Sequence, residues 1–323
     1  MVIAIIGATG LVGSEIINVL EEKKIEKIEK ILFVATSKNI GKKIKYKKIN
    51  YKIITIKNAI ESKPDFVLFS AGSETAKKYA KEFCKNGAVV IDNSSEFRMK
   101  KNIKLIVPEL NSHKITQQDK IIANPNCSTI QLVLALSPIH KTNKIKRLVV
   151  STYQAVVGTG YMAVQQLEDE EKNIEKTKVY TRKIHRNAIP HCDEFKKNGY
   201  TKEEEKIIKE TNKILESNIK ITATSVRIPT IGGHGESVNI ELENPSSVKE
   251  IVDLLKKQKG VVVETGNKYK TPIETKSKNE VFVSRIRKDN SQKNSFNMWI
   301  VADPLRKGAA TNAVQILETL INK

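Results

Sequence analysis

Apolar and polar positions in the first part of the chain follow a repeating order of strand and helix. Residues 2–6 form a continuous apolar run, typical of a strand buried on both faces of a parallel sheet. A glycine-rich turn at 7–13 leads into apolar residues at helical spacing, and a second apolar strand follows at 30–35. The order continues with strands at 65–72, 88–95 and 104–110 and a helix at 74–87. This alternation predicts the α/β class, with an N-terminal Rossmann-like doubly wound parallel sheet.

The second part of the chain has a different order. It predicts a buried helix at 128–139 and an amphipathic helix at 199–216. It also predicts strands at 146–157, 220–230, 236–244, 261–267, 280–289 and 295–303, with a further helix at 248–258 among them. This pattern favours an α+β domain with a mixed sheet. We therefore expect a cofactor domain at 1–125 and a catalytic and dimerisation domain at 126–306, with a last helix at 307–323 packing back on the first domain. Residues 172–188 have no clean period and are expected to form an extended or interface loop.

Composition narrows the class of protein. A length of 323 residues suits two domains of roughly 150 residues each. The net charge of +20 comes from 56 basic and 36 acidic residues, and 48 of the basic ones are lysine. Nucleic-acid surfaces rely more on arginine, so we interpret the excess as a solvated surface and expect no specific nucleic-acid partner. No apolar run approaches the ~18 residues of a membrane span, and no charged leader precedes the first strand. We expect a cytoplasmic protein with no membrane partner.

The turn at 7–13 has the features of a dinucleotide loop. Gly7, Gly10 and Gly13 allow a tight turn and a close approach of the backbone to a pyrophosphate at the helix N-terminus. A tight turn that binds nothing remains the alternative. The second strand is followed by the sequence Thr36, Ser37, Lys38 and Asn39, without the acid that usually meets a free ribose hydroxyl. NADP is therefore preferred over NAD.

The three cysteines differ in their surroundings. Cys127 lies in a proline-containing turn directly before an apolar helix, where unpaired backbone N–H groups would favour the thiolate and stabilise an oxyanion. Cys84 is expected to be a small core residue, and Cys192 a loop or core thiol, because its neighbour His191 cannot readily face it. The absence of a CxxC pair gives no reason to expect a metal.

Other polar residues complete a candidate site. His234 is flanked by glycines that clear space and allow unusual backbone angles, whereas His113, His140 and His185 are expected to be solvated. Arg227, in an apolar strand, either pairs with an internal acid or binds an anionic substrate. Arg98 is a second candidate anion site, with a salt bridge to Glu96 as the alternative, and Gln154 is expected to be buried and hydrogen-bonded. A nucleotide loop, a thiol, a base and two anion-binding groups together indicate oxidation of an aldehyde through a thioester.

Nine segments of the chain resemble, in order, those of aspartate-semialdehyde dehydrogenases. They are GATGLVG, SAGSETA, DNSSEFRM, VPELN, NPNCSTIQ, TYQAVVGTG, IPHCDEFKKNGYTKEEEK, VRIPTIGGHGESV and DPLRKGAATNAVQILE. The resemblance runs nearly end to end. It implies NADP-dependent interconversion of L-aspartate 4-semialdehyde and phosphate with 4-phospho-L-aspartate, on the route to lysine through diaminopimelate, methionine and threonine. It also implies a homodimer formed through the second domain.

The resemblance also implies roles for individual residues. Cys127 resembles the nucleophile, His234 the general acid/base and Gln154 the amide that orients the substrate. The substrate-binding set that it implies is Arg227 for the α-carboxylate, Glu203 for the amino group, Arg98 and Lys206 for phosphate, and Asn126 beside the thiol. Because Glu203 and Lys206 are three apart on one predicted helix, they can face the same site. The implied cofactor-binding residues are Gly7, Thr9, Gly10, Leu11, Val12, Thr36, Lys38, Asn39, Gly72 and Gly158.

Three positions depart from the family pattern. Val157 replaces a serine on the nicotinamide side, Pro304 follows Asp303 where an amide residue is common, and Gly235 replaces a serine beside His234. These changes bear on cofactor affinity and rate more than on reaction type. N-acetyl-glutamyl-phosphate reductase is the nearest alternative enzyme, but its thiol motif resembles NPGCYPT, and its acetylated substrate does not call for Glu203. A noncatalytic lysine-rich homologue that binds polyanions is the alternative from another class.

Overall fold

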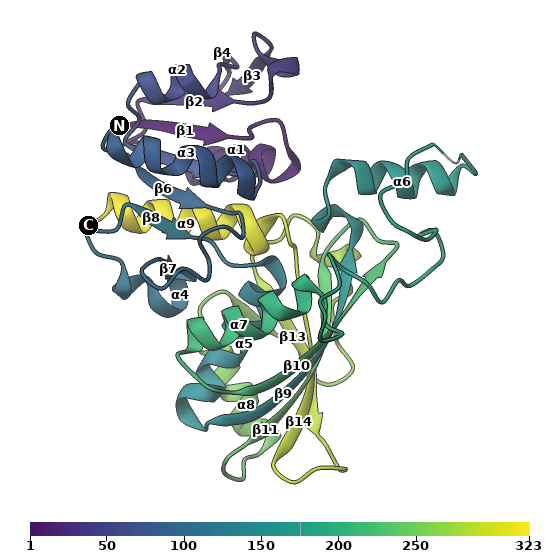
Figure 1. Ribbon diagram of the computed structural model, residues 1–323. Helices are drawn as coiled ribbons and strands as arrows, with labels where there is room; N and C mark the ends of the chain where they lie inside the picture. Colours follow the sequence, from purple (N-terminus) through teal and green to yellow (C-terminus); the bar gives the residue numbers. More distant parts are fainter. Residues whose placement is uncertain (175) are drawn as a thin grey trace. The chain divides into compact units, whose positions relative to one another are not determined.

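The structure is a computed structural model that describes residues 1–174 and 176–323. The chain divides into two compact units (Figure 1). Unit 1 contains Met1–Pro125 and Ala309–Lys323, and unit 2 contains Asn126–Gly308.

Unit 1 is built on a six-stranded sheet with the order β2-β1-β5-β6-β8-β7. Its neighbouring strands all run parallel, which confirms the predicted doubly wound class. The strands are β1 (Val2–Ile6), β2 (Lys30–Val34), β5 (Phe66–Phe69), β6 (Val89–Asp92), β7 (Lys104–Leu105) and β8 (Ile121–Ala123). The helices of this unit are α1 (Leu11–Lys23), α2 (Ile56–Glu61), α3 (Ser73–Lys85), α4 (Pro108–Asn111) and α9 (Thr311–Ile321).

The last helix completes the core of unit 1. Fully buried side chains of α9, among them Val314 and Leu317, join Ile3 of β1 and Ile16 of α1 in one hydrophobic cluster. Burying such side chains contributes roughly 1.5–3 kcal/mol each. The C-terminal segment therefore belongs to the fold of this unit although more than a hundred residues of unit 2 precede it.

One local prediction in unit 1 was wrong and one local feature was missed, each for an identifiable reason. The strand expected at 104–110 ends at Leu105, because Pro108 lacks an N–H group and instead takes a position in the first turn of α4. A hairpin of β3 (Lys43–Tyr46) and β4 (Ile49–Lys52) was not anticipated. Its turn consists of Lys47 and Lys48, both with positive φ, where glycine or asparagine usually marks such a turn.

Unit 2 contains a mixed six-stranded sheet with the order β10-β9-β11-β14-β13-β12. The pairs β10–β9 and β12–β13 are parallel and the others antiparallel, which confirms the predicted mixed sheet. The strands are β9 (Ile145–Ala155), β10 (Lys220–Ile228), β11 (His234–Leu242), β12 (Val261–Val263), β13 (Val281–Lys288) and β14 (Ser295–Ala302). The helices α5 (Cys127–Thr142), α7 (Lys202–Leu215) and α8 (Val248–Lys256) contact the sheet, and α5 also contacts the other two.

A fourth helix of unit 2, α6 (Tyr161–Glu171), was not predicted from the sequence. It organises the segment after it, in which no helix or strand occurs over 172–174 and 176–188; residue 175 lies outside the described part of the chain. Gln166 accepts hydrogen bonds from the backbone of Val179 and Tyr180, and Glu170 accepts from Ile184 and His185. Side chains of one helix thus hold an irregular segment whose backbone has no ladder partner.

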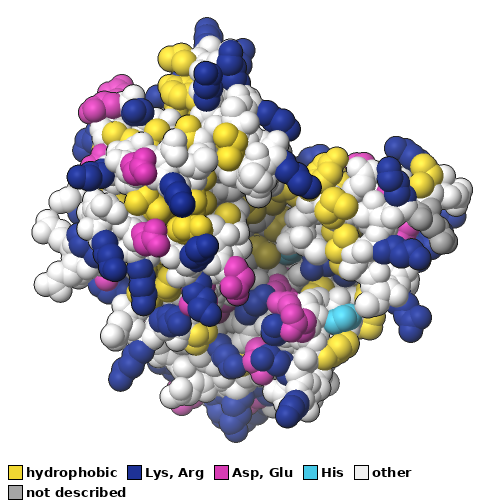
Figure 2. Space-filling model, turned by 45° about the horizontal axis from the view of Figure 1, so that its top comes forward, with side chains coloured by type: hydrophobic (Ala, Val, Ile, Leu, Met, Phe, Trp, Pro, Cys, Tyr) yellow, Lys and Arg dark blue, Asp and Glu magenta, His cyan; other side chains and the backbone are white. Residues whose placement is uncertain are grey.

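Basic side chains are scattered over the face shown in Figure 2, with acidic and neutral ones between them. Lys206 and Lys209 of α7 pair with carboxylates of their own helix, Glu203 and Glu205. Over the described ranges, no helix combines the length and the apolar character that crossing a membrane requires.

Candidate functional site

Cys127 is the first residue of α5, and Asn126 caps this helix. The Asn126 side-chain oxygen accepts hydrogen bonds from the backbone N–H groups of Ser128 and Thr129, at 3.0 and 3.2 Å. These two donors were expected to be unpaired and open to an oxyanion, so that expectation is corrected. The dipole of the 16-residue helix still favours a thiolate at Cys127. The backbone N–H of Asn126 donates to the Glu210 carboxylate at 2.7 Å, which anchors the turn that precedes the thiol.

His234 begins β11 and is fully buried. Its Nδ1 accepts a hydrogen bond from the backbone N–H of Ala155 at 3.0 Å, so the proton of the neutral ring lies on Nε2. Burial and then the nearby charge of Arg227 lower the pKa of His234 to about 3. Nε2 has no hydrogen-bond partner among the described residues. The ring is therefore neutral at neutral pH and presents an N–H group that is available to a ligand.

Arg227 lies on β10 and is buried. Its Nη1 donates to the carbonyl oxygen of Ala155 at 2.8 Å, so one peptide segment contacts both Arg227 and His234. The guanidinium carbon also lies 5.9 Å from the centroid of the Tyr180 ring. Within the described ranges no carboxylate forms a salt bridge with Arg227, which favours an anionic ligand over an internal acid as its partner.

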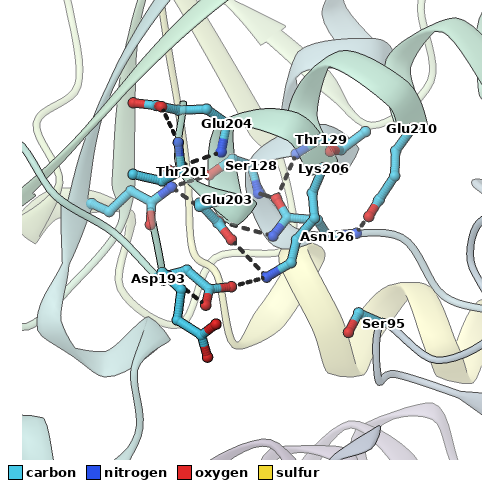
Figure 3. A network of polar contacts seen from close by, with 12 residues as sticks. Ser95, Asn126, Ser128, Thr129, Asp193, Thr201, Glu203, Glu204, Lys206 and Glu210 are labelled. Carbon is cyan, nitrogen blue, oxygen red and sulfur yellow. Dashed lines mark hydrogen bonds and ion pairs between the residues drawn. The ribbon is translucent and has the colours of Figure 1, made fainter. Parts of the chain in front are cut away.

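Glu203 is the centre of a polar network beside the capped end of α5 (Figure 3). Its Oε1 accepts from the side-chain amides of Asn126 at 2.9 Å and of Gln154 at 3.2 Å, and its Oε2 lies 3.2 Å from the Lys206 ammonium. Burial would raise the pKa of Glu203, but the charge of Lys206 and the amide hydrogen bonds outweigh it and lower the pKa to about 2. Glu203 is therefore an ionised carboxylate within a buried site.

The start of α7 explains how Glu203 and Lys206 reach this network. Thr201 and Glu204 form a capping box, in which each side chain bonds the backbone N–H of the other residue, at 3.3 and 2.7 Å. The other Glu204 oxygen accepts from the backbone N–H of Ser225 at 2.9 Å and ties the helix to β10. The predicted i, i+3 arrangement of Glu203 and Lys206 is present, with both side chains on one face of α7.

Sequence reasoning missed Asp193, whose carboxylate lies 2.6 Å from the Lys206 ammonium. Its backbone has a positive φ of 67°, a conformation that aspartate tolerates better than most residues. The only signal in the sequence was its place in the segment IPHCDEF, because its partner lies 13 residues further on. The preceding residue, Cys192, is buried, as predicted for a core thiol, and burial raises its pKa to about 12.

The remaining histidines and Cys84 were assigned with mixed success. His140 is buried and its Nδ1 accepts from the backbone N–H of Ile145 at 3.0 Å, so the prediction of a solvated side chain was wrong. It lies in the last turn of α5, close to the start of β9, where its ring satisfies a backbone donor. His113 is exposed and His185 is half-buried. Cys84 was expected in the core but is half-buried, and its Sγ donates to the carbonyl oxygen of Lys120 at 3.3 Å. Burial raises the pKa of this thiol to about 11.

Two departures from the family pattern have a structural explanation in unit 2. A Cβ atom on Gly235 would lie 2.2 Å from the Trp299 ring, so Trp299 fills the space that a serine would need. The glycines beside His234 thus serve close packing; His234 and Gly235 do not have the unusual backbone angles that were expected. Asp303 accepts hydrogen bonds from Leu305 and Arg306, and the intervening Pro304 has no N–H group to satisfy.

The glycine loop of unit 1 fits a pyrophosphate. A Cβ on Gly7 would lie 2.3 Å from Ser70 O and one on Gly13 would lie 2.1 Å from Gly7 O, so both glycines permit close backbone packing. Gly10 has no such contact and precedes α1 without a side-chain cap. Leu11 and Val12 form the first turn of this helix, whose N–H groups can bind an anion. Gly72 occupies the equivalent position before α3.

Other predicted ligand-binding residues of unit 1 gather after β2 and β6. Asn39 donates to the Thr9 hydroxyl at 3.2 Å and accepts from Lys42 at 2.8 Å, which adds Lys42 to the predicted group. Thr36 and Lys38 are exposed at the adjoining turn. Arg98 is buried and donates to the carbonyl oxygen of Asn93 at 2.7 Å, while Glu96 pairs with Lys100. In the part of the chain that the structure describes, no group of three or more His, Cys, Asp or Glu side chains is placed to hold a metal ion.

The chain combines a parallel sheet of the dinucleotide-binding type with a mixed-sheet unit in which the thiol of Cys127 lies at the capped N-terminus of a helix. These are the features of a semialdehyde dehydrogenase. Family models agree with this class: the semialdehyde dehydrogenase NAD binding domain matches residues 2–118, and the semialdehyde dehydrogenase dimerisation domain matches residues 136–307.

Individual relatives narrow the class further. The chain is 46% identical to the aspartate-semialdehyde dehydrogenase of Aquifex aeolicus, covering 99% of this chain and 98% of that one. It is 42% identical to the enzyme of Campylobacter jejuni, covering 98% and 96%. The crystal structure of aspartate semialdehyde dehydrogenase II from Vibrio cholerae superposes with a TM-score of 0.96 at 38% identity, over 99% of this chain and 98% of that one. This chain belongs to the aspartate-semialdehyde dehydrogenase family, whose members are oxidoreductases that act on an aldehyde.

Proposed function

We propose that this protein interconverts L-aspartate 4-semialdehyde, phosphate and NADP⁺ with 4-phospho-L-aspartate and NADPH through a thioester on Cys127. The observation that carries the proposal is the network around Glu203. Glu203 is an ionised, buried carboxylate that bonds Asn126, the residue before the thiol of Cys127. Such a carboxylate suits a substrate that bears an ammonium group. The Vibrio cholerae enzyme has also been solved as a complex with ASA, and that structure superposes with a TM-score of 0.96 at 37% identity.

Each end of the substrate has a candidate partner in unit 2. We assign the α-carboxylate to Arg227, whose guanidinium has no carboxylate partner among the described residues, and the α-ammonium to Glu203. Gln154 donates to both Glu203 and the Ser128 hydroxyl, at 3.2 and 3.0 Å, and in this role orients the substrate near the thiol. Arg98 and Lys206 are assigned to phosphate.

The chemistry follows from these groups. Cys127 attacks the aldehyde carbon as a thiolate, a C–S bond forms, and the carbonyl electron pair moves to oxygen. His234 is the general acid/base, and its Nε2–H donates a hydrogen bond to this oxygen as negative charge develops. A bound nicotinamide would supply the acceptor for the hydride that leaves the same carbon. A thioester remains on Cys127, and attack by a phosphate oxygen forms the acyl phosphate and returns the thiolate.

We assign unit 1 to NADP and unit 2 to catalysis and dimerisation. The sequence after β2 offers hydroxyl, amide and ammonium groups and no acid, which suits a 2′-phosphate. A homodimer formed through unit 2 is supported by the dimerisation-domain match over residues 136–307. Sedimentation should then report twice the mass of one chain, and a monomer at assay concentration would contradict the dimer.

The experiment that tests the function is a spectrophotometric assay of phosphate-dependent NADPH formation from L-aspartate 4-semialdehyde. N-acetyl-glutamate 5-semialdehyde serves as a control, since its acylated nitrogen carries no charge for Glu203, and NAD⁺ serves as a control for cofactor choice. No turnover with reduced Cys127 would reject the proposed reaction. Equal rates with NAD⁺ would reject only the assignment of NADP.

A further inference from the structure

The two oxygens of Glu203 have different partners (Figure 3). Oε1 accepts from two neutral amides, those of Asn126 and Gln154. Oε2 has one partner among the described residues, the Lys206 ammonium at 3.2 Å. An incoming substrate ammonium that binds Glu203 must therefore meet Oε2, the oxygen that Lys206 occupies.

Lys206 has a second and closer anchor. Its ammonium lies 2.6 Å from Asp193 Oδ2 and 3.2 Å from Glu203 Oε2, and Figure 3 shows it between the two carboxylates. The Asp193 side chain is partly exposed, at 31%, whereas that of Glu203 is 10% exposed. The lysine can thus leave Glu203 and still retain a carboxylate partner at the more open side of the site.

We propose that Asp193 is a positioning residue that holds Lys206 while the substrate ammonium takes its place on Glu203 Oε2, and that this exchange prepares Lys206 for phosphate. The inference rests on the proposed function, which assigns the substrate ammonium to Glu203 and phosphate to Lys206. Before the exchange, one ammonium faces two carboxylates. After it, two ammonium groups face them, and Lys206 has gained a free N–H donor.

This exchange couples the two ligands. Phosphate meets a net negative cluster in the free protein and a neutral cluster once the amino aldehyde is bound, so its affinity rises. An aldehyde that lacks the amino group leaves Lys206 on Glu203 and the cluster negative. Coupling between sites is commonly about 5- to 150-fold, and we expect a value on the order of tenfold here.

The test uses the full-length protein with Cys127→Ala, which binds aldehydes without reacting, in the presence of NADP⁺. Inorganic phosphate is titrated by calorimetry with L-aspartate 4-semialdehyde or with succinic semialdehyde, the same aldehyde without its amino group. Phosphate affinity is expected to be about tenfold higher with the amino aldehyde. Equal phosphate affinity with both aldehydes would overturn the exchange.

The substitution Asp193→Asn then tests the anchor. Asparagine tolerates the left-handed backbone and keeps an oxygen for the Glu194 N–H, so the fold of this turn is preserved. We expect the coupling to fall below about twofold and the affinity for the amino aldehyde alone to drop several-fold, because Lys206 stays on Glu203. Coupling that is unchanged in Asp193→Asn would show that the anchor is not needed.

Glu194→Gln is the matched control. Glu194 is adjacent to Asp193 in the chain, and its carboxylate pairs with Lys202, a residue of the same helix as Lys206. Among the described residues, the carboxylates that pair with Lys206 are those of Asp193 and Glu203 and not that of Glu194. In Glu194→Gln, the coupling between the amino aldehyde and phosphate should equal that of the protein without this substitution. A loss of coupling as large as that in Asp193→Asn would overturn the specific role of Asp193. Turnover of the protein with intact Cys127 is measured separately, so failure of the reaction is distinguishable from failure of the exchange.

Discussion

Gly158 lies against the ring of His234, and the substitution Gly158→Ala tests the geometry of this pair. A Cβ atom on Gly158 would lie 2.8 Å from His234 Nε2 and 3.0 Å from Cε1, and it would be 3.5 Å from Arg227 Nη1. The first contact is shorter than real Cβ atoms show and the second is unusually tight, whereas the third is ordinary van der Waals contact. The histidine ring or the turn that contains Gly158 must therefore move when alanine is introduced.

The surroundings of His234 set the size of the effect. The ring is fully buried and its Nδ1 is held by the Ala155 N–H at 3.0 Å, so it cannot move freely. Overpacking of this kind costs about 1–3 kcal/mol of unfolding free energy. A displacement approaching 1 Å at a reacting group costs up to about a hundredfold in rate. We expect kcat/KM to fall about 10- to 100-fold and the unfolding free energy to drop by about 2 kcal/mol.

Urea denaturation and steady-state kinetics measure both quantities, and a double-mutant cycle locates the cause. In a His234→Ala background the clash is removed, so Gly158→Ala should then change the unfolding free energy by less than about 0.5 kcal/mol. If the changes in unfolding free energy caused by the two substitutions simply add in the double variant, the reasoning is refuted.

Gly158 is also a proposed cofactor residue, so the NADP dissociation constant must be measured in the same variant. If the clash with His234 dominates, this constant should change less than about threefold while kcat/KM falls. A loss of NADP affinity that accounts for the whole kinetic effect would instead assign Gly158 to the cofactor alone.

Three further predictions concern the nucleophile and two buried ionisable groups. Cys127→Ser should lower kcat about a thousandfold or more with NADP binding retained, because a hydroxyl is a far weaker nucleophile than a thiolate, and unchanged turnover would reject the assignment. The pKa of His234 is lowered from 6.5 to about 3, so between these pH values the unfolded chain binds a proton that the folded chain does not. Stability should fall as pH drops through this window, and in His234→Asn denaturation curves between pH 7 and 4 should show a shallower fall. Burial raises the pKa of Glu236 well above 4.5, so the folded chain retains a proton that the unfolded chain releases, and stability falls as pH rises above about 4.5. Glu236→Gln should therefore raise the melting temperature at pH 8 with little change at pH 4, and an equal shift at both values would contradict a protonated Glu236.

Local patterns in the sequence determined the fold class and the central chemical groups. Continuous apolar runs separated by helical spacing specify a parallel sheet, because strands covered on both faces must be apolar throughout. Cys127 was identifiable because a helix N-terminus follows it directly, and Gly7 because a βα turn follows its strand. These features depend on neighbours within a few residues, which sequence displays.

Residues whose role depends on distant partners were decided by the tertiary structure. Asn126 caps the helix α5 and accepts from backbone N–H groups that the sequence predicted to be unpaired. His140 is buried because β9 begins beside it. Trp299 of β14 explains the glycine at 235, since the two strands pair only in the folded sheet. Asp193 meets Lys206 because the segment before α7 folds back along that helix.

The charge of the protein illustrates the same division. Composition alone indicated an excess of lysine and no specific use for it. Folding selects Lys206 from 48 lysines by placing it between Asp193 and Glu203. Electrostatic interactions fall off with distance and depend on burial, and both are properties of the folded chain rather than of the order of its residues.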